Sequence, residues 1–264
     1  MNTSRKIIFL LTIIPFFYQC NPPAEKQEKA QLLVEVDTLY RQKGNCESND
    51  CIDAHIIFPH FSGTVAADQI NQQVKELIYY DLLIDSAKVD QLNMQELADE
   101  LIRDYENAKE EFKEATLNFE YNITSEVTYR HPRIWSINFN IYTYTGGAHP
   151  MTYQKYLNVD PDTGEKIDLG KFFTNQDELK RLVEREIRET HDIETEQLWS
   201  DVFFTERFQW PENMGLTNDG LVLVYNPYEI LPYAAGFTEV IIPLVEAGQY
   251  LSIDLQTEAE EALQ

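Results

Sequence analysis

The chain has 264 residues, of which 45 are acidic and 21 are basic, so its formal net charge is -24. Hydrophobic residues make up 43% of it, which suffices for a packed core and excludes a wholly disordered chain. The acidic excess argues against nucleic acid as a partner, because phosphate contacts need clustered lysine and arginine. It argues equally against docking of a basic patch on an anionic lipid surface.

The beginning of the chain predicts export. The Arg5–Lys6 pair precedes an apolar run, Ile7–Tyr18, which has the length of a secretory signal and falls short of the roughly 20 residues of a membrane-spanning helix. The segment ends at Cys20. This arrangement resembles a lipoprotein signal of the Bacteroidetes type, in which the cysteine is lipidated and becomes the new N-terminus. We therefore expect residues 1–19 to be a lipoprotein signal peptide; a plain signal peptide cut elsewhere is the alternative.

Cys46 and Cys51 are the remaining cysteines. Disulfides persist in the oxidising compartments that exported proteins reach, so these two residues are predicted to be bonded. The closed loop is short, and the expected stabilisation is about 2 kcal/mol. A metal site that adds His55 and His60 is the alternative, but the spacing fits no standard zinc pattern.

Hydropathy periods predict the first half of the fold. Two strands are expected at 32–41 and 54–61, after a polar tether. One helix is expected from Asp68 onward and another over 94–115, each with an apolar stripe at helical spacing. The stripes are Ala67, Ile70, Val74, Leu77 and Ile78 in the first helix, and Leu97, Leu101, Tyr105, Ala108 and Phe112 in the second.

The period then changes to two. Leu117–Thr124 and Trp135–Tyr142 each alternate apolar and polar residues, on either side of a turn near His131. This pattern predicts an antiparallel hairpin with one face in water. A further strand is expected at 153–159, followed by a turn at 160–164.

The last elements are predicted from a cap and from apolar runs. A third helix is expected to begin near Thr174–Asn175. The run at 220–225 is apolar on both faces, which favours a central buried strand, and 237–243 is expected to be the last strand. The order of elements predicts an α+β fold, mostly antiparallel sheet with about three packed amphipathic helices. The apolar stripe of the third helix comprises Leu179, Leu182, Val183 and Ile187.

Two segments carry a resemblance to a known family. They are 144–149 (YTGGAH) and 228–236 (YEILPYAAG). Together they resemble a paired set of domains of unknown function in exported bacterial proteins. The pair is similar to the extracellular, lysozyme-sensing part of anti-sigma-V factor and to the non-catalytic N-terminal part of a peptidoglycan deacetylase. The resemblance implies a role at the cell envelope, and it implies no single activity.

The resemblance and the element order together predict a division of the mature chain. Residues 20–45 are expected to hold the tether and the first strand. An N-terminal α+β subdomain is expected at 46–150 and a C-terminal α+β subdomain at 151–264.

Gly146, Gly147 and His149 form the first candidate binding segment. Paired glycines let a ligand or another backbone approach closely, and a histidine can donate a hydrogen bond. We favour a turn at a strand end, in which the glycines supply positive φ and His149 fastens the loop. On this interpretation His149 acts through the stability of the fold, and a ligand loop is the alternative.

Tyr228 and Tyr233 form the second candidate binding segment. With Tyr225 and Trp210 they would make an aromatic surface on which a glycan stacks. Packing in the core beside the buried strand is the alternative.

Motifs that dictate a reaction are missing from the sequence. It contains no P-loop and no G-x-S-x-G, and its histidines have no metal-ligand spacing. Asp160, Asp162 and Glu165 lack the glycine of a calcium loop and predict a turn instead. We therefore expect no cofactor, no metal and no catalytic residue.

These observations favour a binding module that a lipid anchors to the cell envelope, on the periplasmic side or at the outer membrane surface. Removal of 1–19 takes away two basic and no acidic residues, so the mature chain would carry -26. Such a charge attracts basic proteins, of which lysozyme is an example. Peptidoglycan is the other expected partner. A cell-wall glycan hydrolase or deacetylase is the alternative function.

Overall fold

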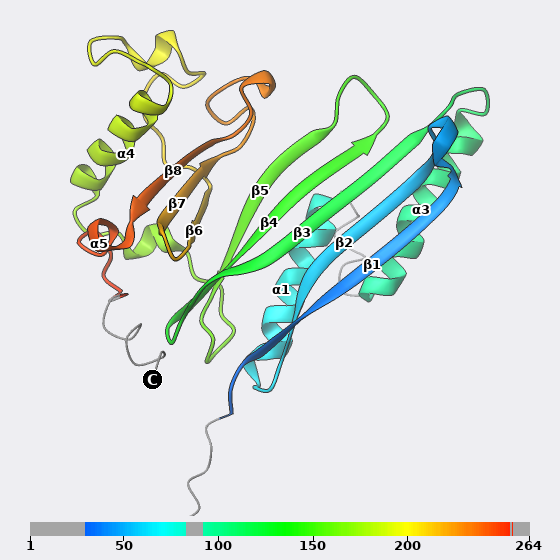
Figure 1. Cartoon of the computed structure of the whole chain (residues 1–264), viewed down its shortest axis with the longest axis horizontal. Coiled ribbons are helices and arrows are strands. Elements are labelled where there is room, and N and C mark those ends of the chain that lie inside the picture. Colours follow the sequence, from blue (N-terminus) through cyan, green and yellow to red (C-terminus); the bar gives the residue numbers. More distant parts are fainter. Residues whose placement is uncertain (1–29, 83–91, 254, 256–264) are drawn as a thin grey trace, which may run out of the picture. The chain divides into compact units, whose positions relative to one another are not determined.

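The computed structural model describes residues 30–82, 92–253 and 255 (Figure 1). The predicted signal peptide and Cys20 lie outside these residues. The described chain from Gln31 onward belongs to one compact unit, which holds a five-stranded sheet and a three-stranded sheet. No helix within the described ranges is long and apolar enough to cross a membrane. The predicted α+β class is confirmed.

The five-stranded sheet has the order β1-β2-β3-β4-β5. Its neighbours are antiparallel except for β2 and β3, which run parallel. Parallel neighbours need a long crossover connection, and the helices that lie between β2 and β3 in the chain belong to it. The predicted hairpin is confirmed as β3 and β4. The strands are β1 (Leu33–Asn45), β2 (Asp50–Ser62), β3 (Asn118–His131), β4 (Ile134–Thr145) and β5 (Met151–Val159).

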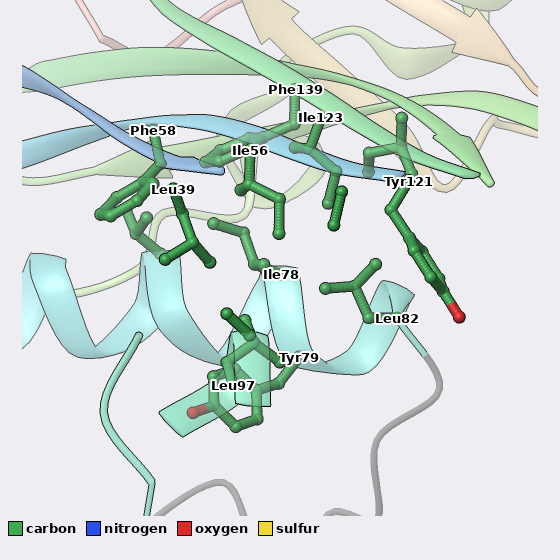
Figure 2. Close-up of a cluster of buried hydrophobic side chains, with 14 of the residues drawn as sticks. Leu39, Ile56, Phe58, Ile78, Tyr79, Leu82, Leu97, Tyr121, Ile123 and Phe139 are labelled. Atoms are coloured by element: carbon green, nitrogen blue, oxygen red, sulfur yellow. The ribbon is translucent and has the colours of Figure 1, made fainter. Parts of the chain in front are cut away.

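Helices α1 (Ala66–Asp81) and α3 (Met94–Glu111) pack on one face of this sheet. Figure 2 shows side chains from alternate strand positions pointing toward α1 and meeting Ile78 and Leu82. Both predicted helical stripes lie mainly in this core. Fully buried strand residues include Leu39, Ile52, Ile56, Ile123 and Phe139.

Asn93 fixes the start of α3. Its side chain accepts a hydrogen bond from the N–H of Glu96 at 3.0 Å, and the Glu96 carboxylate accepts one from the Asn93 N–H at 2.7 Å. This capping box satisfies donors that the first helical turn leaves free. The helix ends at Glu111 and not at 115 as predicted, because Phe112 leaves helical geometry and the chain turns, with the Ala115 N–H bonded to the Phe112 carbonyl.

The three-stranded sheet is antiparallel, in the order β6 (Asn213–Leu216), β7 (Gly220–Tyr225) and β8 (Thr238–Pro243). All residues of β7 are buried, which confirms the predicted central strand. Helices α4 (Gln176–Thr190) and α5 (Leu244–Ala247) pack with it around a second core. The predicted stripe of α4 is buried there. The segment 166–173 contains a short 3-10 helix, η2 (Leu169–Phe172).

Strand β6, which no hydropathy period predicts, joins the two sheets. Its Asn213 side chain accepts a hydrogen bond from the Tyr156 N–H on β5 at 3.1 Å. Asn226, just after β7, accepts one from the Gln154 N–H at 2.8 Å. Gly215 lies against the Tyr156 ring, so closely that a Cβ there would stand 1.9 Å from a ring carbon. The subdomain boundary expected between 150 and 151 stays a prediction; the strand after it, β5, is bonded along β4.

Candidate binding surface

Cys46 and Cys51 are bonded to each other, as predicted. The bond closes the tight connection between β1 and β2, where the Asn45 side chain accepts a hydrogen bond from the Glu47 N–H at 3.1 Å. Its effect is to fasten β1, the edge strand of the sheet.

The predicted turn at 160–164 is also present. The Asp160 carboxylate accepts hydrogen bonds from the N–H groups of Asp162 and Thr163, at 2.8 and 3.0 Å. Asp160 therefore serves the turn itself. Across the described ranges, no group of three or more histidine, cysteine, aspartate or glutamate side chains is arranged to hold a metal ion.

Gly146 and Gly147 form the tip between β4 and β5, where both have positive φ, 80° and 120°. No other atom lies within 4 Å of where either Cβ would stand, so the backbone conformation and not crowding accounts for glycine here. The Tyr144 hydroxyl donates to the Gly147 carbonyl at 3.2 Å and steadies the tip.

His149, beside this tip, contacts the second candidate segment. Its ring stacks on that of Tyr233, with centroids 4.1 Å apart and planes 22° apart. Tyr233 also stacks with Tyr228, at 6.1 Å and 29°. His149 Nδ1 lies 2.8 Å from the Pro150 carbonyl oxygen. Three of the predicted residues, from loops far apart in the sequence, thus form one exposed group of rings.

The loop that carries Tyr228 holds it in an unusual conformation. Tyr228 has φ 74°, a value that L side chains other than Asn and Asp rarely adopt. Its N–H donates to the Leu231 carbonyl at 2.8 Å, which closes the turn, and its side chain is 51% exposed. Such local strain occurs most often at functional positions, so an exposed tyrosine held this way is a candidate contact.

Tyr142 and Tyr144 extend the group along β4. Burial raises the pKa of the Tyr142 hydroxyl, and the Glu120 carboxylate and the hydroxyls of Tyr233 and Tyr144 raise it further. Tyr142 therefore stays protonated and can donate a hydrogen bond at neutral pH. We call Tyr142, Tyr144, His149, Tyr228 and Tyr233 the aromatic surface. In the sequence, Tyr142 is a polar-face position of an alternating strand, and Tyr144 begins the segment 144–149 that carries the family resemblance.

The other two predicted aromatic residues lie in the second core. Tyr225 is buried and its hydroxyl donates to the Gln209 carbonyl at 2.6 Å. Trp210 packs between Phe173 and Phe208, with ring centroids 5.2 and 5.1 Å away. The predicted aromatic set therefore divides into the exposed Tyr228 and the half-buried Tyr233 at the surface and two residues in the core.

A polar cleft of about 790 Å³ lies beside β5, between α1 and the loop after β7. Lys155 lines it and pairs with the buried carboxylate of Asp81, while its ammonium lies 4.5 Å from the Tyr80 ring centroid. Glu229 lines the same cleft. Burial raises the pKa of Glu229 to about 7, and the nearby charge of Glu212 adds to the rise. The only sequence signal for Glu229 is its place next to Tyr228.

Two family models match consecutive parts of the chain. The model described as "Deacetylase PdaC" matches residues 45–152, and the one described as "Protein of unknown function (DUF3298)" matches 170–244. The predicted pair of domains is thereby confirmed. The first match contains His149 and the second contains Tyr228 and Tyr233, so the aromatic surface is built from both.

Solved structures share this fold. A DUF3298 family member from Bacteroides fragilis aligns with a TM-score of 0.62 and 20% identity, over 85% of this chain and 95% of its own. A DUF3298 family protein from Pseudomonas aeruginosa aligns with a TM-score of 0.59 and 19% identity, over 85% and 96%. At these identities the likeness concerns the fold.

Curated relatives match a shorter stretch. Immunogenic protein MPB64 of Mycobacterium bovis and immunogenic protein MPT64 of Mycobacterium tuberculosis are each 29% identical over 133 residues. The match covers 47% of this chain and 57% of each relative, so the chain spans just over half the length of these proteins.

Proposed function

We propose that this protein, which carries a PdaC domain followed by a DUF3298 domain, is a binding module whose aromatic surface recognises the glycan of peptidoglycan. The two domains indicate a cell-envelope-associated module of unknown role. The finer assignment rests on one observation, the exposed stack of His149, Tyr233 and Tyr228. Aromatic rings present flat apolar faces, and tyrosine adds a hydroxyl for hydrogen bonding, which suits the mixed surface of a sugar ring.

The test is co-sedimentation of the purified protein with insoluble peptidoglycan. Tyr228→Asn removes the exposed ring, and asparagine tolerates the positive φ at this position better than alanine does. We expect this variant to lose binding and to keep its melting temperature. Phe112→Ala, which removes an exposed ring at the end of α3, is the matched control and should bind normally. Retention of binding by Tyr228→Asn would remove the aromatic surface from the proposal.

His149 is proposed to support the surface and not to contact the ligand. His149→Ala should lower the melting temperature, because it removes the stack that joins the two loops. Binding by the folded fraction should persist. Full stability with abolished binding would make His149 a ligand contact.

A basic protein such as lysozyme is the second candidate partner, favoured by the formal net charge of -24. Charge alone gives an attraction that salt screens within about 10 Å at 0.1 M. Specific recognition should weaken with salt yet persist. A titration with lysozyme that loses all binding at high salt would leave only nonspecific attraction and favour the glycan.

Export and lipid anchoring at Cys20 complete the proposal. The support is the apolar run of Ile7–Tyr18, which ends two residues before this cysteine. Mass spectrometry of the membrane fraction should find an acylated N-terminal cysteine. A processed N-terminus without acyl chains, downstream of Cys20, would contradict it.

A further inference from the structure

The face of the five-stranded sheet turned away from α1 and α3 carries a continuous row of side chains. The register pairs Tyr40 with His55, His55 with Asn122, Asn122 with Tyr142, and Tyr142 with Thr152. One position from each strand therefore lies in a line that crosses the sheet. The line meets the aromatic surface at Tyr142.

Four of the five positions follow a buried residue, which indicates that they point away from the helices. Tyr40 follows Leu39, and Asn122 lies between Tyr121 and Ile123, which belong to the helix-covered core. Side chains alternate between the two faces of a strand, so the row occupies the opposite face. Tyr40 is 51% exposed, and His55 and Asn122 are exposed as well.

The face is hollowed at the end of the row near β1. A depression of about 340 Å³ is lined by Tyr40, Asp53, His55, Glu120, Tyr121 and Asn122. The Tyr40 and His55 rings meet edge to face, with centroids 6.1 Å apart. In the wall of the depression, the Asp53 Oδ2 accepts a hydrogen bond from the Gln42 Nε2 at 3.4 Å, which holds this carboxylate in place.

We propose that this row is a series of subsites for the linear glycan backbone of peptidoglycan, which crosses the strands from the aromatic surface to Tyr40; the proposal rests on the proposed function. Exposed rings suit the apolar faces of sugars; amides donate hydrogen bonds to hydroxyl groups and accept them, and carboxylates accept them. Asp53 and Glu120, paired across β2 and β3, place carboxylate acceptors beside the row.

The geometry sets a length requirement. Tyr40 on β1 and Tyr142 on β4 are separated by three strand spacings, about 14 Å. A single sugar ring cannot bridge this span, whereas a chain of several can. Affinity should therefore rise with chain length until the glycan reaches Tyr40.

The experiment measures the affinity of the full protein for chitin oligosaccharides, from the dimer to the hexamer. For the wild type we expect binding to tighten with length. Tyr40→Ala should bind the dimer normally and the hexamer about threefold to tenfold more weakly. Tyr40→Ala should remain folded because the ring is exposed, and Asn122→Ala gives a second probe of the row. Phe112→Ala serves again as the control.

The outcomes separate the two proposals. Equal affinity for all lengths, with binding lost in Tyr228→Asn, overturns the row and leaves the aromatic surface in place. Length dependence that Tyr40→Ala and Asn122→Ala leave unchanged also overturns the row. Failure of every oligosaccharide to bind overturns the row, and co-sedimentation with peptidoglycan then decides the proposed function separately.

Discussion

The two faces of the five-stranded sheet are built from the same strands and differ in almost every other respect. One face presents Ile56, Ile123 and Phe139 to α1 and α3, and these three side chains are fully buried. The other presents His55, Asn122 and Tyr142, which are exposed or half-buried. Burial of apolar area stabilises the first face, whereas these exposed positions of the second contribute little to stability and are free to vary for binding. The first face explains why the chain folds, and the second is where its recognition is proposed.

Neighbouring residues on β3 give the sharpest test of this comparison. Ile123→Ala should lower the free energy of unfolding by about 2–5 kcal/mol, because it opens a cavity in a closed core. Asn122→Ala should change it by less than about 0.5 kcal/mol. Urea titrations of both variants measure the difference. Similar losses of stability in the two variants would contradict the proposed difference between the covered and the exposed face.

The next largest effect is expected at Glu229, a half-buried carboxyl next in sequence to the exposed Tyr228. Its pKa is about 7 in the folded protein against an ordinary 4.5, so the folded state holds the proton more tightly than the unfolded chain. Stability should therefore fall as pH rises from about 4.5 to about 7 and level off above. Glu229→Gln should remove this slope and stabilise the protein at pH 8 by at most about 3 kcal/mol. Melting curves across this pH range provide the measurement, and an unchanged slope would contradict it.

The disulfide fastens β1, the strand that supplies Tyr40 to the exposed face. Reduction of Cys46 and Cys51 should cost about 2 kcal/mol, through the freedom regained by the unfolded chain. Melting temperatures with and without reductant report the loss. The double variant with serine at both positions should match the reduced protein and should not respond to reductant.

The cap of α3 gives the smallest effect, and it separates the helix start from core packing on the covered face. Asn93→Ala should destabilise by about 1 kcal/mol, because it removes the acceptor for the N–H groups of Gln95 and Glu96. Asn93→Asp keeps an acceptor and should restore most of the stability in the same melting experiment. Equal loss in both variants would show that the side chain acts through something other than capping.

The covered face could be predicted from the sequence because periodicity reports burial directly. The stripe of Leu97, Leu101 and Tyr105 and the alternation around Ile123 identify residues that face the core. The exposed row could not be predicted, because it depends on which strands are neighbours. The parallel pairing of β2 and β3 places His55 beside Asn122, and hydropathy contains no information on that choice.

The same distinction holds for the candidate site. Glycine content and tyrosine spacing indicated Gly146, Gly147, His149, Tyr228 and Tyr233. Their sequence did not indicate the stack of His149 on Tyr233, which forms only when the loops of the two domains meet. Strand β6 could not be predicted for a related reason, because its position depends on a contact distant in the sequence. The Asn213 side chain is hydrogen-bonded to β5, and Gly215 packs against Tyr156.

The amide side chains that join the two sheets also protect an edge of the five-stranded sheet from pairing with a second copy of the chain. An edge strand with free N–H and C=O groups is a template for another chain, and long exposed edges promote aggregation. Along β5 the Gln154 and Tyr156 N–H groups are occupied by Asn226 and Asn213, and both side chains also donate to the Gln154 carbonyl. Intermolecular pairing through this edge is therefore blocked, and growth of the sheet by strand addition is confined to β1, whose exposed charges discourage it.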